Sequence, residues 1–100
     1  MPRCKKKRCC RRLNEEKIFK PISIPLKELE IVELELDEFE AIRLCDLEGK
    51  NQIEAGEIME ISRGTVQRLL KSGRKKIVYA LLHSYGLKIK DNYQKEEQKK

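Results

Sequence analysis

The stretch that decides the fold is residues 52–71, QIEAGEIMEISRGTVQRLLK. A helix-turn-helix packs two helices at a steep angle, so it needs a small residue where they touch and apolar residues in the wedge between them. With Gln52 as the first position, the small fifth position is Gly56. Positions four, eight, ten, fifteen and eighteen should be apolar, and they are Ala55, Met59, Ile61, Val66 and Leu69. The stretch therefore predicts a helix-turn-helix.

The ends of the two helices carry their own signals. Asn51 and Ser62 stand where N-capping side chains should precede the first helix, over 52–59, and the second, which starts at 63. Glu60 occupies the turn position at which glycine is usual, and a left-handed residue other than glycine costs about 1–2 kcal/mol there. Gly56 inside the first helix costs about 1 kcal/mol relative to alanine. We therefore expect strain at Glu60.

The second helix should continue to His83 or Ser84 and end before Gly86. Its apolar residues fall on one side at helical spacing. We expect this buried stripe to contain Val66, Leu69, Leu70, Gly73, Ile77 and Leu81. The charged residues of the helix lie away from the stripe and should face solvent.

This outer side predicts a surface for double-stranded DNA. Residues early in such a helix contact base edges in the major groove, where arginine suits guanine and glutamine suits adenine. The candidate base contacts are Arg63, Thr65, Gln67 and Arg68. Candidate phosphate contacts in the same helix are Lys71, Arg74, Lys75 and Lys76. The plainer alternative is a helical hairpin with a basic exterior, which leaves the clustering of charge unexplained.

The distribution of charge supports a polyanionic partner more strongly than the net charge of +6 does. The charged residues of 28–60 are mainly acidic, whereas residues 61–90 contain no Asp or Glu. Residues 1–12 contain no acid either, and their cations should reach phosphates or a minor groove. These arm cations are Arg3, Lys5, Lys6, Lys7, Arg8, Arg11 and Arg12.

The rest of the chain fits a mainly α fold: a small helical domain with an extended basic N-terminal arm. A helix over 36–48 buries Phe39, Ile42 and Cys45 on one stripe and stops at Gly49. We expect the many acids of 28–60 to coat a surface.

Before that helix, PISIP at 21–25 should be extended because of its prolines. Residues 26–30 are a short helix or an extended segment, and 31–36 are strand-like. Beyond the last helix, residues 87–90 (LKIK) could form a short strand.

We divide the chain into an arm and polar connector over 1–20, a DNA-binding domain over 21–90 and a disordered charged tail over 91–100.

Cys4, Cys9 and Cys10 form a C-x4-C-C pattern inside the basic arm. Zinc takes four ligands, commonly from closer cysteine pairs, and the single histidine, His83, lies far along the chain. Neighbouring cations would favour thiolates, so a redox or metal-sensing role is an alternative to spectator thiols. We expect no metal and no cofactor, with Cys45 a small core residue.

Several function classes are not supported by the sequence. No apolar run reaches the roughly 18 residues that span a bilayer, and there is no signal peptide, so we expect a cytoplasmic protein away from membranes. No catalytic set of side chains and no phosphate-binding glycine loop is evident, so we expect neither an enzyme nor a small-molecule substrate.

Residues 34–77, LELDEFEAIRLCDLEGKNQIEAGEIMEISRGTVQRLLKSGRKKI, resemble region 4 of sigma-70, which binds promoter −35 elements. Residues 2–93 are similar to the uncharacterised protein family 0251, also called domain of unknown function 134. The shared segments are FKP at 19–21, IPLKELE at 24–30, DEFEAIRLCDLEG at 37–49, SRGTVQR at 62–68 and RKK at 74–76. The chain departs from the family at Ser23, Gly56 and Glu60, where glycine, alanine and glycine are common. The resemblance implies an α-helical DNA-binding domain whose SRGTVQR helix contacts the bases.

The sequence thus predicts a DNA-binding transcriptional regulator. A homodimer could form through the apolar positions of 26–36, which are Leu26, Leu29, Ile31, Val32 and Leu34. Two alternatives stay open. One is RNA binding through the arginine-rich arm, and the other is a module that contacts RNA polymerase or a regulator without binding DNA.

Overall fold

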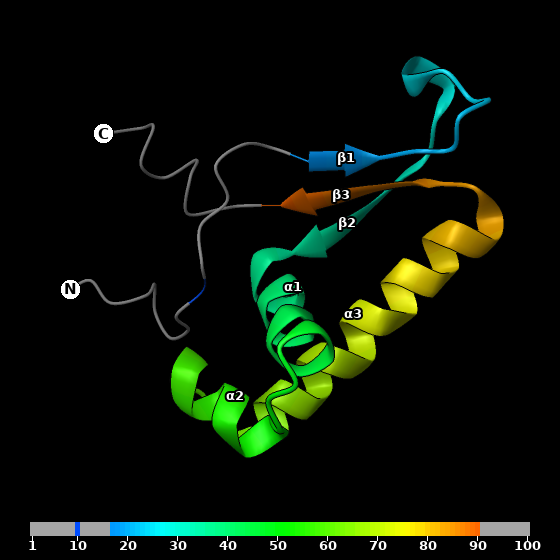
Figure 1. Ribbon diagram of the computed structural model, residues 1–100. Coiled ribbons are helices and arrows are strands. Elements are labelled where there is room, and N and C mark those ends of the chain that lie inside the picture. The colour runs from blue at the N-terminus through cyan, green and yellow to red at the C-terminus, as the bar shows by residue number, and fades with distance from the viewer. Residues whose placement is uncertain (1–9, 11–16, 91–100) are drawn as a thin grey trace, which may run out of the picture.

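The structure, a computed structural model, describes Cys10 and residues 17–90. Figure 1 shows this part of the chain as mostly helical, with a small sheet at one end. The elements in order are β1 (Lys17–Phe19), the 3-10 turn η2 (Leu26–Glu28), β2 (Ile31–Glu35), α1 (Leu36–Ile42), the π-helical turn η3 (Arg43–Leu47), α2 (Gln52–Met59), α3 (Arg63–His83) and β3 (Gly86–Lys90). Most of the basic arm and the tail at 91–100 lie outside the described residues.

The three strands form one sheet in the order β1-β3-β2, with the last strand of the chain in the centre. β3 runs antiparallel to β1 and parallel to β2, with Leu87 opposite both Phe19 and Val32. The predicted strands over 31–36 and 87–90 are confirmed. Lys17–Phe19 is a correction, because we placed these residues in a connector and they form an edge strand. A three-residue strand has too little alternation to be recognised, and its partner lies about 70 residues away in sequence.

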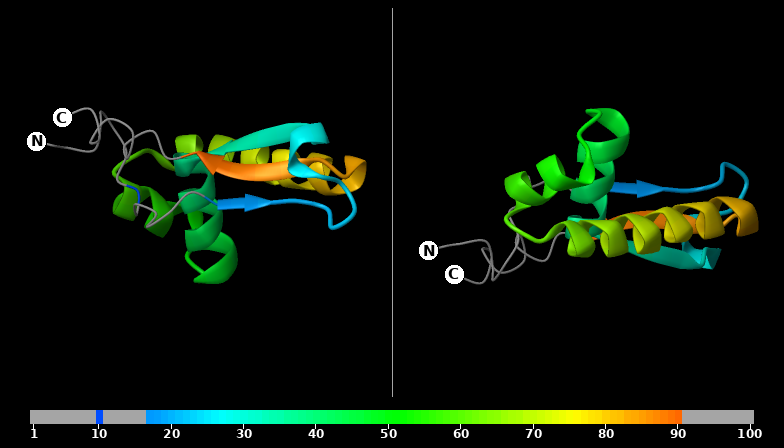
Figure 2. Two further views of the ribbon diagram at one scale, coloured as in Figure 1. Left: turned by 90° about the horizontal axis from the view of Figure 1, so that it is seen from above. Right: turned by 90° about the horizontal axis from the view of Figure 1, so that it is seen from below.

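The elements form two layers, with α3 lying along one face of the sheet (Figure 2). Helix α3 contacts β2 and β3. In the right-hand view of Figure 2, seen from below, β1 lies to the side of the helix. At the other end, α1, η3, α2 and the start of α3 enclose the main core. The buried residues of this core are Ala41, Leu44, Ala55, Met59, Val66 and Leu70.

The predicted apolar wedge between α2 and α3 is confirmed. Ala55, Met59 and Val66 are fully buried, while Ile61 and Leu69 are half-buried and pack against the same cluster. Gly56 is required by a close contact, but with the turn: a Cβ there would lie 2.7 Å from the carbonyl oxygen of Ile61. The backbone of the turn, up to the first nitrogen of α3 (Arg63 N, 3.6 Å), therefore packs directly on α2 at this position.

The caps and the turn also agree with the sequence. The side chains of Asn51 and Ser62 accept hydrogen bonds from the backbone N–H groups of Glu54 and Thr65. Glu60 ends α2 in the left-handed conformation, with φ 62° and ψ 43°. The strain expected at Glu60 is thus located in the turn that sets the angle between α2 and α3.

The helix predicted over 36–48 is present but changes type after Ile42. The N–H of Glu48 donates to the carbonyl of Arg43, a five-residue spacing that defines a π-helical turn. Gly49 then adopts φ 77° and ends the segment, as predicted. Cys45 is half-buried against the core, where burial, followed by the charge of Asp46, raises the pKa of its thiol. The thiol is therefore a neutral packing group, as we predicted.

The close crossing of α1 over α3 occurs at Gly73. A Cβ at this position would lie 2.7 Å from Ile42 Cδ1 and 3.2 Å from Glu38 Cβ, so no larger residue fits without movement. Glu38 is buried at the crossing, where its carboxylate accepts from Lys76 Nζ at 2.8 Å and from Ser72 Oγ at 2.6 Å. These bonds lock α1 against the middle of α3.

Two acids correct the expectation that residues 28–60 form only a charged coat. Glu38 is 5% exposed and Glu40 is 3% exposed. Glu40 accepts a bidentate pair from Arg43, with N···O distances of 2.7 and 3.0 Å, and Arg43 also pairs with Glu48. Buried carboxylates are tolerated here because each has a cationic partner.

One position of the predicted buried stripe of α3 is wrong. Leu81 is 72% exposed, and Ala80 is buried in its place. After Gly73 the helix leaves α1 and lies along the sheet, so the face that is buried shifts by one residue. The remaining stripe positions are buried or half-buried, as predicted.

The apolar positions proposed for a dimer surface at 26–36 do not form one surface. Leu34 is only 1% exposed and belongs to the core, and Leu29 packs over Gly86. Only Leu26 and Ile31 of the five are exposed. Strand β2 buries alternate residues against α3, which is why this segment cannot present all its apolar side chains to a partner.

Replacing Glu60 with glycine should raise the free energy of unfolding by about 1 kcal/mol, because glycine adopts the left-handed conformation without steric cost. Urea unfolding followed by circular dichroism would measure this as a higher midpoint with an unchanged slope. Ser84, which ends α3 at φ 60°, offers a second left-handed site at which glycine should act alike. As a control, Glu57→Gly inside α2 should destabilise, and stabilisation there would contradict the explanation.

Glu38 should make stability depend on acid pH. Burial raises the pKa of Glu38, but the hydrogen bonds from Lys76, Ser72 and the Glu35 backbone, with the charge of Lys76, outweigh it and lower the pKa below its usual 4.5. A lowered pKa in the folded state adds stability above the unfolded value, and that stability is lost as the pH falls through the folded value.

The free energy of unfolding should therefore fall on going from pH 7 to below 4.5, and Glu38→Gln should reduce that fall. Urea titrations at several pH values, with the exposed Glu28→Gln as control, would measure the difference. Parallel pH profiles for wild type and Glu38→Gln would contradict this role.

Candidate nucleic-acid interface

The outer side of α3 in its first half is polar and basic. Val66, Leu70 and Gly73 face the core, which turns the intervening residues outward. The exposed residues on this side are Arg63, Gln67, Arg68, Lys71, Arg74 and Lys75. Three of the four predicted base contacts, Arg63, Gln67 and Arg68, are among them.

The fourth, Thr65, is half-buried and takes part in the helix cap. Its hydroxyl lies 2.9 Å from Ser62 Oγ, and its backbone N–H donates to the same oxygen at 3.1 Å. The Arg68 guanidinium donates to Thr65 Oγ1 at 3.3 Å. Thr65 therefore fixes the start of the helix and the direction of Arg68.

Two of the four predicted phosphate contacts in α3 pair with carboxylates of the same chain. Arg74 donates twice to the Asp46 carboxylate, at 2.6 and 3.1 Å, and Asp46 raises the pKa of Arg74. Lys76 is half-buried and paired with Glu38. These pairs connect α3 to η3 and α1; the Arg74 side chain remains half exposed in its pair, whereas Lys76 is partly covered.

Lys71 and Lys75 differ from these two. Both are exposed, and no ion pair among Cys10 and residues 17–90 involves either of them. They are one helical turn apart and on the same side of α3 as Gln67 and Arg68. This places four polar side chains on one continuous outer surface.

A cleft of about 530 Å³ lies beside this surface, between η3, the start of α2 and the first half of α3. Three cations line it, Lys50, Arg63 and Arg74, together with Asp46. Gln52 lies in the same cleft, and its Oε1 is buried with no hydrogen-bond partner in the described part of the chain. The positive end of the α2 dipole adds to the potential of this cleft.

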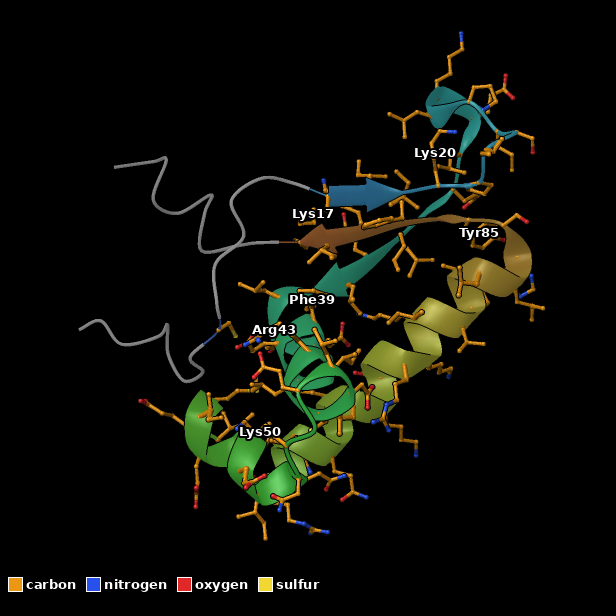
Figure 3. All side chains as sticks on the ribbon, viewed as in Figure 1. Lys17, Lys20, Phe39, Arg43, Lys50 and Tyr85 are labelled. Atoms are coloured by element: carbon orange, nitrogen blue, oxygen red, sulfur yellow. The ribbon has the colours of Figure 1, made fainter. Side chains whose placement is uncertain are left out.

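Lys50, labelled in Figure 3, is a further candidate site residue that the sequence reasoning missed. It follows Gly49 in a stretch whose charged residues are mainly acidic, so the local sequence did not indicate a cationic site there. Its position immediately before the N-cap Asn51 was the available signal, because helix N-termini attract anions.

The thiol alternative falls mostly outside the described residues, as do Cys4, Cys9 and the arm cations. Cys10 is half-buried against the main core. Within Cys10 and residues 17–90, no group of three His, Cys, Asp or Glu side chains could hold a metal ion.

His83 packs among Tyr79 and Tyr85, with ring centroids 4.6 and 5.6 Å away. No helix of this part of the chain is long and apolar enough to cross a membrane.

Comparison with known proteins places this chain among relatives of unknown function. Residues 1–96 match the family model described as "Protein of unknown function DUF134". The chain is 44% identical over 89 residues to a UPF0251 protein of Caldanaerobacter subterraneus subsp. tengcongensis. This match covers 89% of this chain and 75% of the relative. It is also 44% identical over 92 residues to a UPF0251 protein of Shewanella baltica, covering 89% of this chain and 91% of the relative.

No solved structure matches this chain. The family model spans nearly all of the sequence, and each of the two alignments covers most of this chain and most of the relative. The chain therefore belongs to the family of proteins of unknown function DUF134, whose curated members are named UPF0251 proteins.

Proposed function

We propose that α2 and α3 form a helix-turn-helix that binds double-stranded DNA in a sequence-specific manner, and that the protein regulates transcription. The observation that carries the proposal is the outer side of α3, where Arg63, Gln67, Arg68, Lys71 and Lys75 are all exposed. An α-helix of this kind fits the major groove, which is about 12 Å wide.

The side chains divide into two roles along α3. Arg63, Gln67 and Arg68 lie in the first two turns, from which side chains reach base edges when a helix enters the groove by its N-terminus. Lys71 and Lys75 follow in the next turns and suit the phosphates that flank the groove. The bases would then determine the sequence preference, and the phosphates the affinity and the register.

The cleft beside α3 supports one more contact. Lys50 and Arg63 lie in it with the start of α2, and this combination favours a phosphate oxygen. The buried Gln52 Oε1 is an acceptor only, so the donors to the phosphate would be the Gln52 side-chain NH2 group, Lys50 and Arg63. A DNA backbone that follows α2 would thus pass along this cleft, as the first helix of such motifs crosses the backbone.

The test is selection of bound sequences from a random duplex pool, followed by titration of the selected duplex at several salt concentrations. Specific binding should give one recurring sequence and a slope in log K against log salt of about −0.9 per phosphate neutralised. A pool without enrichment, together with a flat salt response, would favour a module that contacts another protein.

Arg68→Ala and Lys75→Ala should have different effects on DNA binding. Loss of a bidentate base contact should relax the preference at one base pair by about 1–3 kcal/mol, so Arg68→Ala should change the selected sequence. Lys75→Ala should weaken binding to all duplexes alike and reduce the salt slope by about one unit. Fluorescence anisotropy with the selected duplex and single-base variants would measure both effects.

Lys27→Ala is a matched control, because Lys27 is exposed in η2, which lies beyond the sheet at the opposite end of the molecule from α2 and the start of α3 (Figure 1). It should leave both the affinity and the sequence preference unchanged. Equal losses from Lys27→Ala and Lys75→Ala, or no loss from Arg68→Ala and Lys75→Ala, would rule out α3 as the DNA-contacting element.

A further inference from the structure

The second half of α3 presents an apolar surface to solvent. Val78 is 62% exposed, Leu81 is 72% exposed and Leu82 is 74% exposed. These three residues, called here the α3 apolar stripe, lie at helical spacing on one side of the helix. Helices of a monomer usually turn polar residues outward, as α3 itself does in its first half.

A hollow of about 250 Å³ adjoins the stripe. Phe19 on β1 and Leu87 on β3 are directly opposite in the sheet and line it, together with Ala80 and Leu81 from α3 and Tyr85. Lys20 also lines the hollow, and its Nζ donates to the carbonyl oxygens of Pro21 and Ile24. Phe19 is 62% exposed although its strand neighbour Leu87 is half-buried. The hollow exists because α3 covers β2 and β3 but lies to the side of β1 (Figure 2).

The segments outside the described residues are poorly suited to cover this surface. Residues 91–100, DNYQKEEQKK, contain one aromatic residue among charged and polar ones, and residues 1–9 and 11–16 are mainly basic or polar. Placing such segments on apolar side chains would strip water from charges without a compensating gain. An apolar surface from another chain is the better match.

We infer that a second copy of this chain covers the stripe and the hollow, with the two α3 helices side by side and antiparallel. A two-fold interface needs a surface that is complementary to itself. This surface combines exposed side chains, Val78 and Leu82, with a hollow that the third stripe residue, Leu81, lines, so each copy can insert its leucine into the hollow of the other. The partner helix then covers β1, the strand that α3 of the same chain leaves open.

The size of the surface agrees with a dimer. With Phe19 and Tyr79, the stripe exposes apolar area on the order of the few hundred Å² that monomers seldom exceed. The contact begins only beyond Lys75, so the first half of α3 remains open. The inferred dimer is argued from the apolar surface alone and does not require that the protein binds DNA.

Sedimentation velocity of the full chain, without DNA and over a range of concentrations, tests the inference. The wild type should be a dimer, and Leu82→Asp should weaken self-association by about a hundredfold or more, because each interface would bury two unpaired carboxylates. Phe19→Asp, from the other side of the contact, should have the same effect. Circular dichroism would show that each variant keeps the wild-type fold.

Leu47→Asp is the matched control, since Leu47 is a leucine of similar exposure, 78%, at the end of η3. It should leave the dimer intact. A wild-type monomer at all concentrations overturns the inference, as does a dimer that Leu82→Asp leaves intact or that Leu47→Asp disrupts equally. Loss of DNA binding with an intact dimer would instead count against the proposed function alone.

Discussion

The close crossing of α1 over α3 at Gly73 is the constraint on which the rest of the structure depends. Without a side chain at this position, Ile42 and Glu38 can lie directly on the α3 backbone. Helix α1 follows β2, and α3 leads into β3, so the crossing also fixes the parallel pairing of these two strands. Glycine costs about 1 kcal/mol of helix propensity inside α3, and the packing of α1 offsets that cost.

Charge in this protein is divided between structure and surface by position along α3. Lys76 and Arg74 hold Glu38 and Asp46, which brings α1 and η3 onto the helix. Lys71 and Lys75 belong to the same run of cations but point to solvent. Buried Glu38 neutralises Lys76 and exposed Asp46 neutralises Arg74, whereas Lys71 and Lys75 have no carboxylate partner among the described residues, so the positive charge of the outer face comes from the cations that these two acids do not contact.

Sequence reasoning worked where a feature depends on neighbouring residues. The caps at Asn51 and Ser62 and the left-handed turn at Glu60 are local, and each follows from a rule about one or two residues. The wedge between α2 and α3 was predictable because its five apolar residues lie close together in the sequence, between Ala55 and Leu69. The outward direction of Arg63, Gln67 and Arg68 followed from the same periodicity.

The features that escaped prediction depend on contacts between distant segments. Lys76 could not be separated from Lys75 without knowing that Glu38 lies opposite, 38 residues earlier. The burial of Ala80 in place of Leu81 depends on where α3 meets the sheet, and the strand β1 exists only because β3 pairs with it. In each case the local pattern allows two answers, and tertiary contacts select one.

The placement of β3 between β1 and β2 has a consequence for the order of folding. The central strand is the last of the three in the chain, so β1 and β2 have no partner until residues 86–90 have been synthesised. The helical half can collapse first, since α1, α2 and the start of α3 are close in sequence and form local contacts quickly. The sheet is then the slow step of a domain that folds from its middle outward, and an emerging chain would hold β1 and β2 unpaired until residues 86–90 have emerged.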